Sequence, residues 1–148
     1  MPKGLKLFAN LVKFALMDVN EKVDYWLELA EYDLETAKIV LEAKRYLHFG
    51  FLCHLSAEKL LKAYYWISLG NEPPYTHNLL VLSSKSGLDS LISASHKQLL
   101  YKLMPLNVEA RYPSEKQEIF KTLNRQYCEE IYKDLKEFLL WMKKLLKK

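Results

Sequence analysis

Three side chains able to carry charge or move protons recur every four residues within an otherwise apolar segment. His54, Glu58 and Lys62 stand in HLSAEKLLK, and on a helix this spacing places them in one column. On a solvated face the column would contribute one Glu–Lys pair, stabilising by about 0.2–0.5 kcal/mol. Large apolar residues flank it, however: Phe51, Leu55, Leu61 and Tyr65. The alternative is a partly covered strip in a cleft or at a subunit contact, where Glu58 needs partners for its charge.

Two further candidates fall in predicted connections, where a rigid scaffold commonly places functional side chains. His77 follows a Pro-Pro-Tyr-Thr sequence, and Arg111 stands in ARYP as one of three arginines. Arginine offers a planar fork for carboxylate or phosphate, and the adjacent Tyr112 offers a stacking face. A salt bridge at a helix end explains Arg111 equally well.

Metal and nucleophile motifs are missing from the sequence. There is no HExxH, paired CxxC, P-loop, GxGxxG or GxSxG, so we expect no metal, no cofactor and no Ser-His-Asp catalysis. The isolated Cys53 and Cys128 indicate buried thiols in a reducing cytoplasm.

Size and charge predict one soluble domain. The chain has 148 residues, of which 50% are hydrophobic, and a net charge of +4. A domain of this size can bury a core without disulfides or metal. Its mildly basic balance permits weak attraction to anions but makes no basic stripe typical of a DNA-binding protein.

Apolar periodicity predicts helices throughout. Residues 23–43 carry a single buried stripe of Val23, Trp26, Leu27, Ala30, Leu34, Ala37 and Leu41, and Asp33 falls among the charged residues expected in solvent. Residues 46–69 are apolar on two sides, which predicts a central helix or one that also meets a second subunit. Gly70 ends this helix.

The second half of the chain completes the predicted bundle. Thr76 is expected to cap a short helix that starts at His77, and Pro105 is expected to end or kink a further helix. Ser114 is expected to cap one long final helix that continues to Leu145. Because no strand alternation is present and the connections are short, we predict an all-α fold: an up-and-down antiparallel bundle of four to five helices.

Residues 1–20 form an amphipathic extension before this domain, which we place at 21–148. Its apolar run is too short and too interrupted to span a bilayer, and we expect no membrane span. The extension packs on the body, contacts a partner or membrane surface, or precedes a true start at Met17. We favour the packed arrangement or the later start.

The pattern of the chain resembles the HEPN family of small prokaryotic helical proteins. The residues that carry the resemblance are YWLELAEYDLETAKIVLEAKRY, HFGFLCHLSAEKLLKAYYW, the later PPYTHNL and ARYP. The resemblance implies a bundle of four or five helices, a homodimer, and a gene beside a minimal nucleotidyltransferase with which the protein forms a toxin–antitoxin-like pair. It also implies nucleotide binding, and many members are metal-independent ribonucleases.

The chain departs from the ribonuclease members, which carry Arg, four to six residues, and then His. No histidine follows Arg111 or Arg125, and those after Arg45 stand at other spacings. A cation beside the general base is therefore absent at the expected spacing. We assign no catalytic residue and rank an enzyme below a binding module.

The matching motifs supply five candidate nucleotide- or RNA-binding residues: Lys62, Arg111, Tyr112, His77 and Glu58. His54 joins them as a candidate because it stands in the same column as Glu58 and Lys62. The hypotheses are a cytoplasmic binding component that pairs with a nucleotidyltransferase, a divergent ribonuclease toxin using His54 or His77 as base, and a structural module in which the Glu58 column organises a homodimer. All three depend on whether the column is sheltered and converges with Arg111.

Overall fold

The computed structural model describes residues 2–107 and 113–147, and this part of the chain is helical without strands. Its α-helices are α1 (Lys3–Leu16), α2 (Val19–Glu42), α3 (Tyr46–Leu69), α4 (Leu79–Lys85), α5 (Ala94–Leu103), α6 (Pro113–Thr122) and α7 (Arg125–Leu146). Two 3-10 helices, η1 (Leu88–Ser90) and η2 (Met104–Asn107), flank α5. The predicted all-α bundle is confirmed. No helix among the described residues has the length and hydropathy to cross a membrane.

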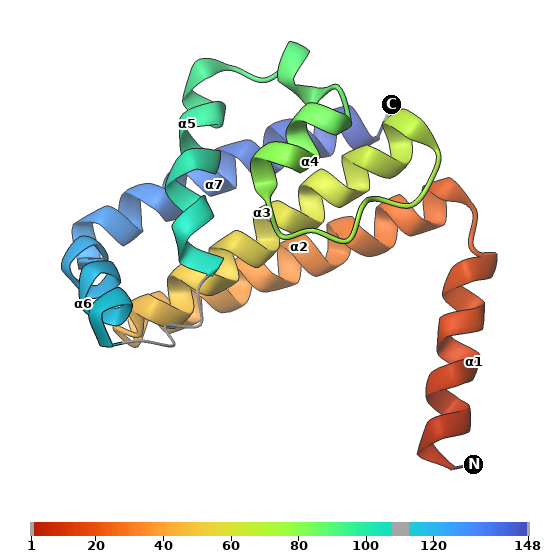
Figure 1. Cartoon of the computed structure of the whole chain (residues 1–148), viewed down its shortest axis with the longest axis horizontal. Coiled ribbons are helices and arrows are strands. Elements are labelled where there is room, and N and C mark those ends of the chain that lie inside the picture. Colours follow the sequence, from red (N-terminus) through yellow and green to blue (C-terminus); the bar gives the residue numbers. More distant parts are fainter. Residues whose placement is uncertain (1, 108–112, 148) are drawn as a thin grey trace.

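Three long helices form the body of the bundle, with α2 and α3 as antiparallel neighbours (Figure 1). The third, α7, packs on both of them and runs in the direction of α3. The chain returns along the bundle through α4 and α5, which cover one side of α3 (Figure 1).

The helix α2 forms because its start is capped and one face is apolar. Asp18 accepts a hydrogen bond from the backbone of Glu21 at 2.8 Å, and the Glu21 side chain returns to the Asp18 backbone, as in a capping box. The predicted stripe from Val23 to Leu41 is buried except for Trp26, which is half-buried.

The helix α3 is the central element. It carries buried side chains all around and contacts α2, α4, α5 and α7, as its two apolar sides predicted. At Gly50 a side-chain carbon would lie 3.3 Å from Cδ1 of both Leu106 and Leu123. Glycine therefore lets these two leucines pack directly on the α3 backbone.

The expectation that Asp33 is solvated is wrong. Its side chain is buried between α2 and α3, where it accepts a hydrogen bond from Lys59. Beside it, the Ser56 hydroxyl donates to the carbonyl oxygen of Ala30 at 2.8 Å. A buried carboxylate is tolerated here because a cation lies opposite it.

Two predicted helix starts are also wrong. Asn78, not Thr76, caps α4, and its side chain accepts from the backbone amides of Leu80 and Val81 at 3.0 and 3.1 Å. Ser114 lies inside α6 instead of before it. Thr76 and Asn78 stand two residues apart, so the sequence offers more than one start for α4.

The predicted final helix is divided at Leu123 and Asn124. The backbone of Asn124 is extended, and its side chain accepts from the amide of Tyr127 at 2.9 Å to start α7. Apolar periodicity continues through the break and conceals it.

Candidate functional site

The middle of α3 holds a buried carboxylate with two partners. The side chain of Glu58 belongs to a residue that is only 4% exposed. Its Oε2 accepts from Nζ of Lys62 at 3.0 Å, and its Oε1 lies 2.8 Å from Nδ1 of His77. Both carboxylate oxygens are thus engaged, as a buried charge requires.

The loop between α3 and α4 positions His77 against this carboxylate. Gly70 ends α3 in the left-handed conformation at φ 71°, which glycine adopts without strain. After Pro73 and Pro74, the Thr76 hydroxyl oxygen accepts from the amide of Asn78 at 3.1 Å, and Asn78 caps α4. His77 is therefore held between an internal turn and a helix start.

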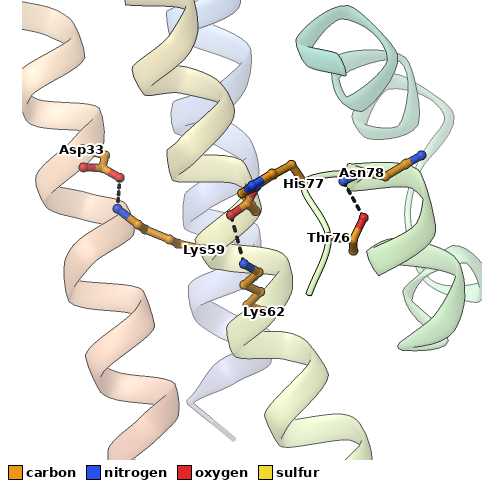
Figure 2. Close-up of polar contacts among 7 residues, drawn as sticks. Asp33, Lys59, Lys62, Thr76, His77 and Asn78 are labelled. Carbon is orange, nitrogen blue, oxygen red and sulfur yellow. Dashed lines mark hydrogen bonds and ion pairs between the residues drawn. The ribbon is translucent and has the colours of Figure 1, made fainter. Parts of the chain in front are cut away.

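Two lysines one turn apart point to different sides of α3. Lys59 reaches Asp33 on α2, whereas His77 approaches α3 from the loop before α4 (Figure 2). Lys62 meets Glu58 on that second side. The Asp33–Lys59 pair therefore fastens α3 to α2, and the Glu58 pair faces the loop.

His54 lies one turn before Glu58 and is fully buried. Burial lowers the pKa of His54 from 6.5 to about 4, while the charge of Glu58 and the backbone of His77 act to raise it. The imidazole is consequently neutral at pH 7. Neither ring nitrogen has a hydrogen-bond partner of good geometry among the described residues. We call His54, Glu58, Lys62 and His77 the Glu58 cluster.

The cluster is partly open to solvent at His77, whose side chain is 54% exposed. Because Nδ1 faces Glu58, Nε2 is the ring nitrogen left to meet a ligand. The Lys62 side chain is 14% exposed. The cluster is thus an anchored polar site with a buried acid and an accessible imidazole.

Lys62 and a second lysine, Lys22, each lie over aromatic rings. The ammonium of Lys62 lies 5.7 Å from the ring centroid of Trp26 on α2. The ammonium of Lys22, also on α2, lies 4.3 Å from the ring centroid of Trp66 on α3 and 5.6 Å from that of Phe14 on α1. Such contacts stabilise a cation without neutralising it.

Tyr75 is a candidate that the sequence analysis missed. It is almost fully exposed, and its ring centroid lies 6.0 Å from that of His77. An exposed ring beside a polar site can stack on a base. Its position two residues before His77 was visible in the sequence, but loop exposure follows no periodic pattern.

The remaining predicted site residues are Arg111 and Tyr112. Both lie outside the part of the chain that the structure describes, so their convergence with Lys62 stays a prediction. Arg125 pairs with Glu129 on the surface of α7. Arg45 lines a separate pocket of about 200 Å³ at the start of α3.

Residues 23–145 match the sequence model of the HEPN domain. The fold is similar to that of TT1696 from Thermus thermophilus, with a TM-score of 0.69 and 19% identity over 83% of this chain and 97% of that chain. It is also similar to ST0689, an archaeal HEPN homologue, with a TM-score of 0.63 and 22% identity over 84% of this chain and 98% of that one. No curated protein matches the sequence.

Proposed function

This chain belongs to the HEPN domain family, and from that premise we propose that it is a component that binds a nucleotide or RNA and pairs with a minimal nucleotidyltransferase. The observation that carries the binding proposal is the double contact of the buried Glu58 with Lys62 and His77. The carboxylate holds a cation and an imidazole in fixed positions before any ligand arrives. Preorganised donors cost less ordering on binding than mobile surface side chains do.

The chemistry of the cluster suits a phosphate next to a base. The ammonium of Lys62 has three donor protons, so its bond to Glu58 leaves others for phosphate oxygens. His77 presents its second ring nitrogen from a half-exposed side chain, and Tyr75 adds a ring for stacking. In this proposal Lys62 and His77 hold phosphate and Tyr75 covers the base.

The partner half of the proposal rests on the family resemblance, which implies a nucleotidyltransferase gene beside this one and a homodimeric state. The two proteins would then act as a toxin–antitoxin-like pair. Co-expression with the product of the neighbouring gene, followed by size-exclusion chromatography, tests it. Separate elution of the two proteins contradicts the pairing and leaves the binding proposal to its own test.

Binding is tested by calorimetric titration of the purified protein with ATP, AMP and a short single-stranded RNA. Lys62→Gln removes a charged donor to phosphate, so we expect affinity to fall about 10- to 100-fold. Lys59→Gln is the matched control, because that lysine is also on α3, is 19% exposed and pairs with a buried carboxylate. It should bind as the unchanged protein does.

Two results would contradict the binding proposal. One is the absence of heat with every ligand. The other is an equal loss of affinity in Lys59→Gln and Lys62→Gln, which would trace the effect to the stability of α3 instead of a contact at the cluster. Circular dichroism spectra of both variants check that the helices remain.

A second candidate function, cleavage of RNA without a metal ion, is favoured by the 2.8 Å contact between Glu58 and His77. A carboxylate facing Nδ1 orients an imidazole so that Nε2 can take a proton from a 2′-hydroxyl. His77 is accessible for this role, whereas the buried His54 is not. RNA that stays intact after incubation with the protein in EDTA contradicts this function. If RNA is cleaved, His77→Ala should abolish the cleavage, whereas the control His48→Ala should retain it.

A further inference from the structure

The first helix is unlike every other long helix in the described chain, because none of its residues is buried. It also lies before the residues that match the HEPN domain, so the family does not account for it. Six of its large apolar side chains are between 41% and 81% exposed: Leu5, Leu7, Phe8, Leu11, Val12 and Leu16.

The charges of α1 are separated from this apolar surface. At about 100° per residue, the exposed apolar side chains from Leu7 round to Leu16 span roughly 180° of the helix, and Lys3, Lys6 and Lys13 lie within roughly 80° on the other side. No acidic residue occurs between positions 1 and 17. The helix is therefore amphipathic and purely cationic.

The described ring contacts between α1 and the body of the protein all involve Phe14, near the C-terminal end of α1. The ring of Phe14 lies 5.3 Å from that of Tyr25 and 6.4 Å from that of Trp26, centroid to centroid. The extended backbone of Met17 and Asp18 then separates α1 from α2. Figure 1 shows α1 projecting from the end of the bundle.

We propose that α1 lies in the surface of an anionic membrane and anchors the helical bundle there. Its 14 residues span roughly 21 Å, short of the roughly 30 Å of a bilayer core, so the helix lies in the interface instead of crossing it. A cationic helix with a broad apolar face binds in this way, with the apolar side chains below the headgroups and the lysines among them.

Two features favour lipid over a second copy of the chain. One partner helix covers an apolar stripe of about 100°, which is roughly half of the exposed apolar face of α1. A lipid surface covers the whole of that face. The lysines of α1 also have no acidic residue of a second α1 to meet. Anionic headgroups supply the complementary charge along the whole helix.

The test is flotation of the full chain with vesicles of equal parts phosphatidylglycerol and phosphatidylcholine, compared with pure phosphatidylcholine. We expect binding to the anionic vesicles that weakens with added salt. Replacing the three α1 lysines by glutamine should weaken it on the order of 100-fold, because each lysine near the surface contributes about fivefold. The matched control removes three exposed lysines of α7 and its end: Lys133→Gln, Lys136→Gln and Lys147→Gln.

A second variant tests the apolar face. Phe8→Asn should weaken binding about tenfold or more, since the membrane then no longer buries the apolar ring of this phenylalanine. Ile39→Asn changes a side chain of α2 that is equally exposed and should have no effect. No enrichment on anionic vesicles, or equal binding of the α1 and α7 lysine variants, would overturn the proposal. So would self-association that Phe8→Asn abolishes while vesicles bind nothing, because the occupant would then be a second copy.

Discussion

Replacing Glu58 by glutamine should destabilise the protein far more than a typical substitution of a helix glutamate. The change keeps the shape of the side chain but removes the charge that faces Lys62 and His77. Breaking a buried ion pair by removing one partner costs about 3–5 kcal/mol, because the other charge stays buried without compensation.

The structure reduces this figure. The Lys62 side chain keeps 14% of its exposure and that of His77 keeps 54%, so water recovers part of the lost interaction. We therefore expect a loss of about 2–3 kcal/mol in the free energy of unfolding, at or below the lower end of that range. In a domain of this size the melting temperature would fall by about 5–10 °C.

The assay is thermal unfolding followed by circular dichroism at pH 7, with Glu129→Gln as the matched control. Glu129 also forms an i,i+4 pair, with its Oε1 2.9 Å from Nε of Arg125, but both side chains are more than half exposed. Exposed pairs contribute little to stability, so the control should melt with the unchanged protein. Equal melting temperatures for the two variants would refute the reasoning that Glu58 is a sheltered carboxylate.

Three further predictions concern stability and thiol reactivity and need no ligand. Because the unfolded chain protonates His54 below its ordinary pKa of 6.5 and the folded protein only below about 4, the free energy of unfolding should fall by about 3 kcal/mol as the pH drops through that window. Urea titrations from pH 4 to 7 measure the slope, which should be shallower in His54→Leu. Burial raises the pKa of the Cys53 thiol well above its ordinary value and that of Cys128 to about 11, so neither should react with Ellman's reagent at pH 8 until guanidinium is added; reaction of the folded protein contradicts this. Asn124→Ala removes the cap of α7 and should lower stability by about 1 kcal/mol in urea, whereas an unchanged midpoint would mean that the cap contributes nothing.

The long helices could be predicted from the sequence because burial imposes a period on it. The stripe from Val23 to Leu41 is buried as predicted apart from Trp26, and α3 is central as its two apolar sides indicated. Starts and breaks were harder to predict. The division at Asn124 depends on one local side chain–backbone bond, which leaves the apolar period unchanged.

The sequence predicted which residues form the Glu58 cluster but did not predict all of their contacts. A spacing of four residues indicated that Glu58 and Lys62 could pair, and the structure contains that pair. The spacing could not show that the carboxylate also contacts His77, which lies 19 positions further along the chain in a loop. The burial of Asp33 was missed for the same reason, because its partner Lys59 lies on another helix.

The most direct test of the proposed site uses the four histidines as reporters in a nuclear magnetic resonance titration with ATP. His77 and the fully buried His54 belong to the Glu58 cluster, His48 lines the pocket at the start of α3, and His96 packs against Phe138 and Trp141. We predict that the imidazole signals of His77 shift most, with a smaller change at His54 and none at His48 or His96. Shifts confined to His48, or no shift at any of the four, would contradict a ligand site at Glu58.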